Sequence, residues 1–125
     1  MAQTFVLKTV LDFAAAHTLK DYPGDCAKLH GHNWKIEVQI VGNQLNEIGM
    51  VVDFKDIKRH AKEVVKALDH TYLNDHPHFQ HRNPTAENIA QFLFQQIQAR
   101  IATPQIQMHS ITVWENDRNC VIYSE

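Results

Sequence analysis

The sequence predicts an α+β fold in which an antiparallel sheet carries two helices on one face, in the order β-β-α-α-β-β. Strand-like alternation of apolar and polar residues occupies both ends of the chain, and apolar stripes at helical spacing occupy its middle. Turn-forming residues separate these segments. Strands on both sides of a helical middle are typical of a two-layer arrangement. With 125 residues the chain has the length of one domain, and we expect a single domain over residues 1–125.

The first two strands are predicted from period-two patterns. Over residues 5–13 the odd positions are mostly apolar, which predicts a half-buried strand, and His17 follows on the same parity. Residues 21–25 read Asp-Tyr-Pro-Gly-Asp, which predicts a loop. A second strand is expected over residues 30–41, where the even positions form the apolar side.

The helices are predicted from caps and apolar stripes. Asp53 can accept hydrogen bonds from free N–H groups at the start of the first helix, and Thr85 can do the same for the second, which Pro104 ends. The two stripes are Phe54, Ile57, Ala61, Val64, Val65 and Leu68, then Ile89, Phe92, Leu93, Ile97 and Ile101. Strands over residues 105–115 and 119–123 complete the expected order.

The composition excludes several classes of protein. Hydrophobic residues make up 44% and charged residues 21%, which is a globular mixture and not a disordered one. A net charge of −2 offers no basic surface, so we expect no nucleic-acid partner. No apolar run approaches the ~20 residues of a membrane helix, and no secretory signal is visible at the N-terminus. With only two cysteines, Cys26 and Cys120, we expect a reducing, cytoplasmic setting.

Nine histidines stand out, and the pair His30 and His32 carries the clearest chemistry. Two residues apart on a strand, both rings leave the same face and can chelate one metal ion. His17, at the end of the first strand, can supply a third nitrogen if the two strands pair as a hairpin. Three nitrogens and an open position are the arrangement of catalytic zinc. The alternative, polar residues at the start of a strand, is equally compatible with the spacing alone.

Other candidate residues have plain explanations beside the functional ones. Cys26 precedes His30 by four residues and can act as an acid or base near a cation, although most free cysteines are small apolar fillers. Asp69 can orient His70 and raise its basicity, but both residue types are also common at the end of a helix, where we place them.

Two glutamates are candidates for binding a substrate. Glu115 can accept two parallel N–H groups of a heterocycle, although the residues alone favour a solvated strand end. Glu87 can also bind substrate, but an acid in the first turn of a helix is already explained by the helix dipole. The remaining histidines are expected on the surface or without a visible partner: His76, His78 and His81 in one loop, then His60 and His109.

Six ordered blocks of the sequence resemble the 6-pyruvoyl-tetrahydropterin synthase family and span nearly the whole chain. The three-residue gap between Cys26 and His30 is most like its bacterial branch, the 6-carboxytetrahydropterin synthases of queuosine biosynthesis. The blocks are Phe13-Ala14-Ala15-Ala16-His17, Cys26-x3-His30-Gly31-His32-Asn33, Gly49-Met50-Val51-x-Asp53-Phe54, Leu68-Asp69-His70-x2-Leu73-Asn74, Pro84-Thr85-x-Glu87-Asn88 and Val113-Trp114-Glu115.

The resemblance implies a fold, an assembly and a set of roles. The fold would be the tunnelling fold, in which subunits close their sheets into a barrel, typically of a hexamer, with sites at subunit interfaces. Zn²⁺ would be the cofactor. The implied roles are metal binding for His17, His30 and His32, proton transfer for Cys26, Asp69 and His70, and anchoring of the pterin for Glu115.

The implied reaction converts 7,8-dihydroneopterin triphosphate to 6-carboxytetrahydropterin, acetaldehyde and triphosphate. One alternative is a 6-pyruvoyl-tetrahydropterin synthase, which keeps the three-carbon side chain. Another is a non-catalytic zinc-binding module with a closed four-ligand site, in which Cys26 could be the fourth ligand. The sequence departs from the family pattern in the longer, His-rich loop 75–83, and in Asn116, which stands where a threonine often follows the anchoring glutamate.

Overall fold

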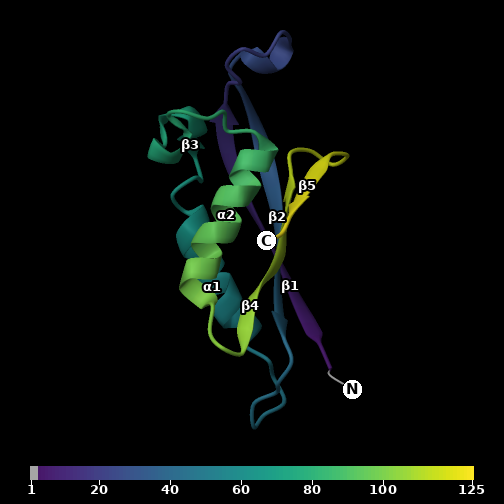
Figure 1. The fold of residues 1–125 in the computed structure, drawn as a ribbon. Coiled ribbons are helices and arrows are strands. Elements are labelled where there is room, and N and C mark those ends of the chain that lie inside the picture. The colour runs from purple at the N-terminus through teal and green to yellow at the C-terminus, as the bar shows by residue number, and fades with distance from the viewer. Residues whose placement is uncertain (1–2) are drawn as a thin grey trace.

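The computed structural model describes residues 3–125 and consists of a sheet layer and a helix layer (Figure 1). The sheet has five strands in the order β3-β1-β2-β4-β5. The α+β prediction with two helices on one face is therefore confirmed. The elements are β1 (Phe5–His17), β2 (His30–Gly42), α1 (Phe54–Val65), β3 (Thr71–Tyr72), α2 (Ala86–Ile101), β4 (Ile106–Trp114) and β5 (Cys120–Tyr123).

The long hairpin of β1 and β2 is the centre of the sheet. The two strands pair antiparallel from Phe5 opposite Gly42 to His17 opposite His30. β1 runs beyond the predicted range 5–13, because the small residues 14–16 continue the alternation that keeps odd positions on the buried side. The loop 18–29 projects beyond the end of this hairpin (Figure 1) and includes a short 3-10 turn at Asp25–Ala27.

Both helices begin at the residues predicted as caps. The Asp53 carboxylate accepts a hydrogen bond from the Lys55 N–H at 2.8 Å, and the Thr85 hydroxyl accepts one from the Asn88 N–H at 3.1 Å. The apolar stripe of α2 is buried as expected, whereas that of α1 becomes buried only from Ile57 onward. Phe54, at the first position of α1, is 52% exposed, which corrects its place in the predicted core.

The segment between the helices differs most from the prediction. α1 ends at Val65, so Asp69 and His70 do not end a helix but belong to the turns that follow it. Leu68 is fully buried and draws this segment into the core, and His70 takes a positive φ of 58°. The two-residue strand β3, which was not predicted, then pairs parallel with β1 at residues 15–16, so the sheet is not wholly antiparallel. A two-residue strand leaves no periodic pattern in a sequence.

The core lies between the helix-facing side of the sheet and the two helices, and it positions the end of the hairpin. Its members include Phe13, Trp34, Ile36, Val38, Ile40, Leu68, Ile89, Leu93, Ile97, Ile111 and Val113. His17, at the end of β1 beside the start of α2, is also completely buried. Neither helix of the described part of the chain has the length and apolar character needed to cross a bilayer.

Candidate functional site

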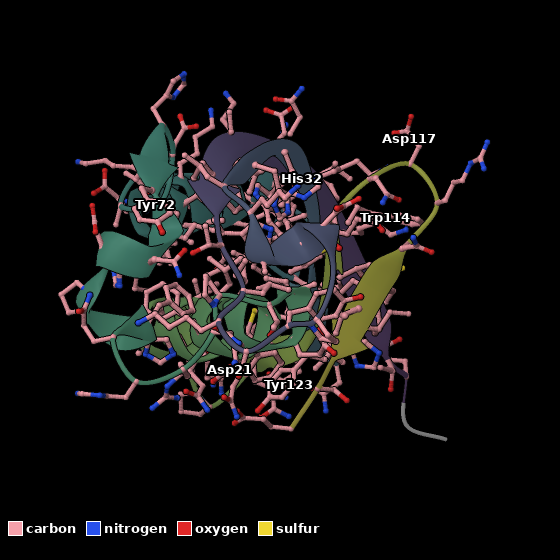
Figure 2. All side chains as sticks on the ribbon, turned by 90° about the horizontal axis from the view of Figure 1, so that it is seen from above. Asp21, His32, Tyr72, Trp114, Asp117 and Tyr123 are labelled. Atoms are coloured by element: carbon pink, nitrogen blue, oxygen red, sulfur yellow. The ribbon has the colours of Figure 1, made fainter. Side chains whose placement is uncertain are left out.

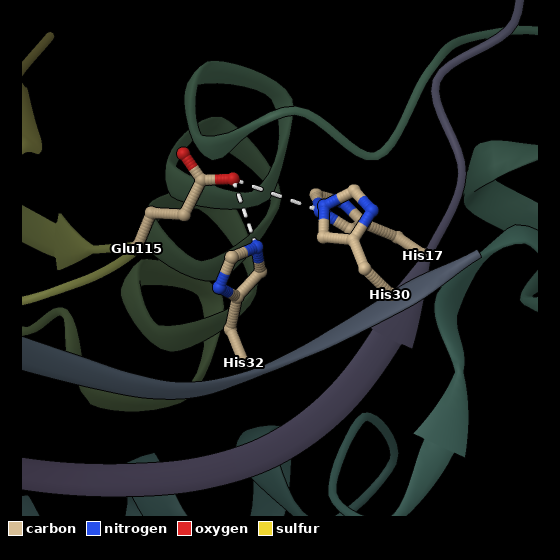
Figure 3. A group of neighbouring side chains, drawn as sticks. All are labelled: His17, His30, His32 and Glu115. Atoms are coloured by element: carbon tan, nitrogen blue, oxygen red, sulfur yellow. Dashed lines mark hydrogen bonds and ion pairs between the residues drawn. The ribbon is translucent and has the colours of Figure 1, made fainter. Parts of the chain in front are cut away.

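Three imidazoles converge where the β1–β2 hairpin meets the start of α2 (Figure 3). His17 is the last residue of β1, and His30 and His32 are the first and third residues of β2. Alternation along each strand turns all three rings to the helix-facing side of the sheet. The ligand atoms of these histidines and of Glu115 all lie within 4.8 Å of one another, and the Nε2 atoms of His17 and His30 are 2.9 Å apart.

The tautomers of two imidazoles are determined by backbone carbonyls. The Nδ1–H of His17 donates to the Pro84 carbonyl oxygen at 2.8 Å, and the Nδ1–H of His30 donates to the Lys28 carbonyl oxygen at 2.7 Å. Each neutral ring therefore keeps its lone pair on Nε2, the atom that faces the cluster. Two lone pairs at 2.9 Å repel unless a proton or a cation lies between them.

The donor set fits a zinc ion. Nitrogens bound to one tetrahedral zinc at ~2.1 Å lie about 3.4 Å apart, so sub-ångström movements would bring His17 and His30 to ligand distance. The Nε2 atom of His32 is buried and makes no well-aligned hydrogen bond among residues 3–125, although a carboxylate oxygen of Glu115 lies 3.2 Å away. A metal ion would satisfy that atom, and the carbonyl partners of the other two rings are the outer contacts that metal-ligating histidines usually make.

Burial also prepares these rings to bind a cation. It is the main cause that lowers the pKa of His17, against the hydrogen bond to Pro84, which raises it. Burial likewise lowers the pKa of His32, while the charge of Glu115 raises it. Both rings are therefore neutral at neutral pH, as metal ligands must be.

Glu115 joins the cluster from the end of β4, as Figure 3 shows. Its Oε1 atom lies 3.2 Å from Nε2 of His32 and 3.6 Å from Nε2 of His17. The side chain is about one third exposed, so it is not the fully solvated strand end that the residues alone favoured. Its carboxylate can either complete a metal site or present its second oxygen to a bound molecule.

Trp34 forms the floor of the cluster, and sequence reasoning did not assign it to the site. Its ring lies 5.2 Å from the rings of both His17 and His32, it is completely buried, and its indole N–H donates to the Ala15 carbonyl at 3.3 Å. In Figure 2, His32 lies among neighbouring side chains, whereas Asp117 points outward from the β4–β5 loop. Trp34 continues the parity of His30 and His32, which was the available signal.

Asp69 and His70 lie at the edge of β1, away from the three imidazoles. The Ala14 N–H donates to Oδ1 of Asp69 at 2.9 Å, and the same oxygen lies 3.0 Å from Nδ1 of His70. The hydrogen bond from Ala14 is the main cause that holds the pKa of Asp69 below its usual range, followed by the contact with His70. The Asp69 carboxylate therefore lies where it can orient the His70 imidazole.

A cleft of about 340 Å³ beside this pair opens on the other face of the sheet. Asp12, Ala14 and Asn33 line it, and they point away from the helices because they alternate with His17 and His32 along their strands. Within one chain, the sheet therefore separates the Asp69–His70 pair from the three clustered imidazoles.

The other predicted site residues lie outside the imidazole cluster. Cys26 is half-buried in the 3-10 turn of the loop 18–29, and within residues 3–125 it does not belong to the His17, His30, His32 and Glu115 cluster that could hold a metal ion. Glu87 is exposed in the first turn of α2. Asn116 accepts hydrogen bonds from the N–H groups of Arg118 and Asn119 at 2.9 Å, so it stabilises the β4–β5 turn.

The His-rich loop is less exposed than expected. His76 and His78 are half-buried with their rings about 5 Å from the ring of Phe92, which corrects their assignment to the surface, while His81 is exposed as predicted. The aromatic residues Phe79 and Phe92 draw the loop against α2.

Comparison with known proteins relates the sequence and the fold of this chain to one family. The sequence profile of the family described as 6-pyruvoyl tetrahydropterin synthase matches residues 7–125. A protein of Archaeoglobus fulgidus, provisionally named 6-carboxy-5,6,7,8-tetrahydropterin synthase, is 38% identical over 94% of this chain and 93% of its own. The Synechocystis protein of that name is 34% identical over 95% and 92%. The solved structure of Caenorhabditis elegans 6-pyruvoyl tetrahydropterin synthase superposes with a TM-score of 0.87 at 25% identity, covering 99% and 97% of the two chains.

Proposed function

The chain belongs to the 6-pyruvoyl tetrahydropterin synthase family, and from this premise we propose that it is a zinc-dependent lyase. Its substrate would be 7,8-dihydroneopterin triphosphate, and its products 6-carboxy-5,6,7,8-tetrahydropterin, acetaldehyde and triphosphate. Water supplies the second oxygen of the new carboxylate, and the pterin ring gains the hydrogens that the side chain loses, so no redox cofactor is needed. The step would serve queuosine (7-deazaguanine) synthesis in the cytoplasm.

The observation that supports the metal role is the partly buried meeting point of three Nε2 atoms. Two of the rings have Nδ1–H committed to carbonyls, and the third has a buried nitrogen that makes no well-aligned hydrogen bond in the described chain. We assign His17, His30 and His32 as the ligands. When bound, zinc supplies Lewis acidity that makes the side-chain hydroxyls of the substrate and the adjacent carbon more acidic.

Glu115 is assigned to hold the pterin through its amino and ring N–H groups. A carboxylate can accept two parallel N–H donors from such a ring, as it does from a guanidinium. Its position beside His17 and His32 would bring the substrate side chain to the metal-binding nitrogens. Glu87, exposed in the first turn of α2, is a further candidate for substrate binding.

Cys26, Asp69 and His70 are assigned to proton transfer. Asp69 fixes His70 with a proton on Nδ1, so Nε2 of His70 is the atom that would exchange protons with the substrate. The Cys26 thiol would move protons at the side chain. Because the sheet separates Asp69 and His70 from the imidazole cluster of the same chain, we propose that each site combines residues of neighbouring subunits in a homo-oligomer, a hexamer by resemblance.

Incubation of the zinc-loaded protein with 7,8-dihydroneopterin triphosphate, followed by mass analysis, tests the proposal. The expected products are 6-carboxytetrahydropterin and acetaldehyde. A product that keeps the three-carbon side chain would instead identify a 6-pyruvoyl-tetrahydropterin synthase, which the 33% identity to the human enzyme of that activity over 75% of this chain keeps as the second candidate. No conversion, and no effect of a pterin on the melting temperature, would identify a zinc-binding module closed by Glu115.

A further inference from the structure

His17 is fully buried, and the proton on its Nδ1 atom is held by one backbone carbonyl. Its Nδ1–H donates to the Pro84 oxygen at 2.8 Å. Loss of this contact would free the ring to place its proton on Nε2, the atom that faces His30 and His32. What holds the Pro84 carbonyl therefore also determines whether His17 offers a lone pair to a cation.

The residue before the proline is held on three sides. The side chain of Asn83 accepts a hydrogen bond from the Lys20 N–H and donates one to the Lys20 carbonyl, both at 2.9 Å. Its backbone carbonyl accepts a hydrogen bond from the side-chain amide of Asn88 at 2.8 Å. Asn83 thus connects the chain that leaves His17 to the first turn of α2.

The position of Asn83 also restrains the Pro84 carbonyl, because the backbone between them has little conformational freedom. The proline ring fixes its own φ near −65°, and a residue before proline is confined to extended conformations. Thr85, which follows, is fixed in its turn as the N-cap of α2. Because the chain is held on both sides, by Asn83 before the proline and by Thr85 after it, ψ of Pro84 and with it the direction of its carbonyl have little freedom left.

A second asparagine makes the same pair of hydrogen bonds to the residue that directly follows His17. The Asn74 side chain accepts from the Thr18 N–H and donates to the Thr18 carbonyl, both at 2.9 Å. Asn74 and Asn83 therefore engage alternate residues of the chain that leaves His17, as a neighbouring strand would. These contacts cross 56 and 63 positions of sequence and tie both ends of the loop 75–83 to the metal-binding end of β1.

We propose that Asn83 and Asn88 are positioning residues that hold the Pro84 carbonyl against Nδ1 of His17 and so keep the His17 lone pair on the metal-binding nitrogen. The inference rests on the metal role proposed above. Neither asparagine touches the metal or the substrate in this scheme. Both act through the tautomer and the orientation of one buried ring.

The discriminating variant is Asn88→Asp. It keeps the size of the side chain but removes the N–H donor that reaches the Asn83 carbonyl. The helix start should be preserved, because the Asn88 backbone N–H still donates to Thr85 and an acid in the first turn interacts favourably with the helix dipole. Asn46→Ala is the control. It removes the side-chain oxygen that accepts hydrogen bonds from the N–H groups of Ile48 and Met50. Asn46 lies in the loop 43–53, at the other end of the molecule (Figure 1).

Three measurements on the 125-residue chain test the proposal. Competition with a chromophoric chelator should show zinc binding about 10-fold weaker in Asn88→Asp than in the parent, the loss usual for an outer contact of a metal ligand. The visible spectrum of bound Co²⁺ should change, and nitrogen chemical shifts of the His17 ring in the metal-free protein should show proton density moving from Nδ1 to Nε2. Asn46→Ala should match the parent in all three.

Zinc affinity of Asn88→Asp within about twofold of the parent, together with unchanged His17 nitrogen shifts, would overturn the proposal. If the parent itself binds no zinc or cobalt, the proposed function loses its metal. The positioning role of Asn83 and Asn88 is then tested by the His17 nitrogen chemical shifts of the metal-free protein alone. A change of these chemical shifts in Asn88→Asp supports the role, and identical chemical shifts refute it.

Discussion

Replacing His32 by alanine should separate the contribution of zinc to stability from that of the imidazole. His32 is half-buried, and its Nε2 makes no well-aligned hydrogen bond among the described residues, although Oε1 of Glu115 lies 3.2 Å from it. An unsatisfied buried polar atom costs about 1–3 kcal/mol, so its removal offsets the packing that is lost. The free energy of unfolding of the metal-free protein should therefore change by less than about 1 kcal/mol, a shift of roughly 4 °C in Tm.

The stabilisation of the parent by zinc should be much larger than that change. At free zinc 100 times above Kd, binding contributes about 2.7 kcal/mol. Unfolding entropies of about 2.1 cal/mol/K per residue give roughly 0.26 kcal/mol/K for 125 residues, and hence a rise in Tm of about 10 °C. With two imidazoles left, His32→Ala should lose nearly all of this rise at the same zinc concentration.

Thermal unfolding followed by circular dichroism, with and without zinc, measures both quantities. His109→Ala is the control, because His109 is an exposed residue of β4 outside the metal-binding group. Its zinc-induced shift should equal that of the parent. Retention of more than half of the parental shift in His32→Ala would refute the three-imidazole site, and an equal loss in both variants would point to surface binding of zinc.

Three further outcomes are expected. Cys26→Ala should abolish turnover while zinc stays bound, as product mass and metal content will show; normal turnover would remove its proton-transfer role. Glu115→Gln should lower kcat/KM by about 10–100-fold through loss of a charge-assisted hydrogen bond while leaving zinc affinity unchanged, and the opposite pattern would make Glu115 a metal ligand. Burial, followed by the charge of Arg82, lowers the pKa of His78 below its usual value of 6.5. The unfolded chain therefore takes up this proton first, and denaturant titrations should show the parent losing stability relative to His78→Phe as pH falls below about 6.5; a difference independent of pH would contradict this.

Much of the fold could be predicted because each element leaves its own local pattern. The alternation in β1 and β2, the caps Asp53 and Thr85 and the stripe of α2 are short-range features, and the structure has them where the pattern puts them. The local pattern did not predict two features that depend on long-range contacts, namely β3 and the end of α1. β3 exists because residues 15–16 offer a free edge, and α1 stops at Val65 while Leu68 packs into the core.

In the candidate site, too, local features could be predicted from the sequence and long-range contacts could not. The spacing of His30 and His32 and the parity of His17 predicted three imidazoles on one face, since alternation along a strand is a property of the backbone. The approach of Glu115 to these rings could not be predicted, because it depends on where β4 pairs with β2.

The order of residues alone specifies the three donor imidazoles, the two strands that carry them and the family to which the chain belongs. Only long-range folding selects which nitrogen of His17 faces the cluster, because the carbonyl of Pro84 holds its Nδ1, whereas His30 is held by the nearby carbonyl of Lys28. Every residue carries a carbonyl, so this partner has no signature in the order of side chains. Its direction follows from folding, which brings residues 67 positions apart into contact.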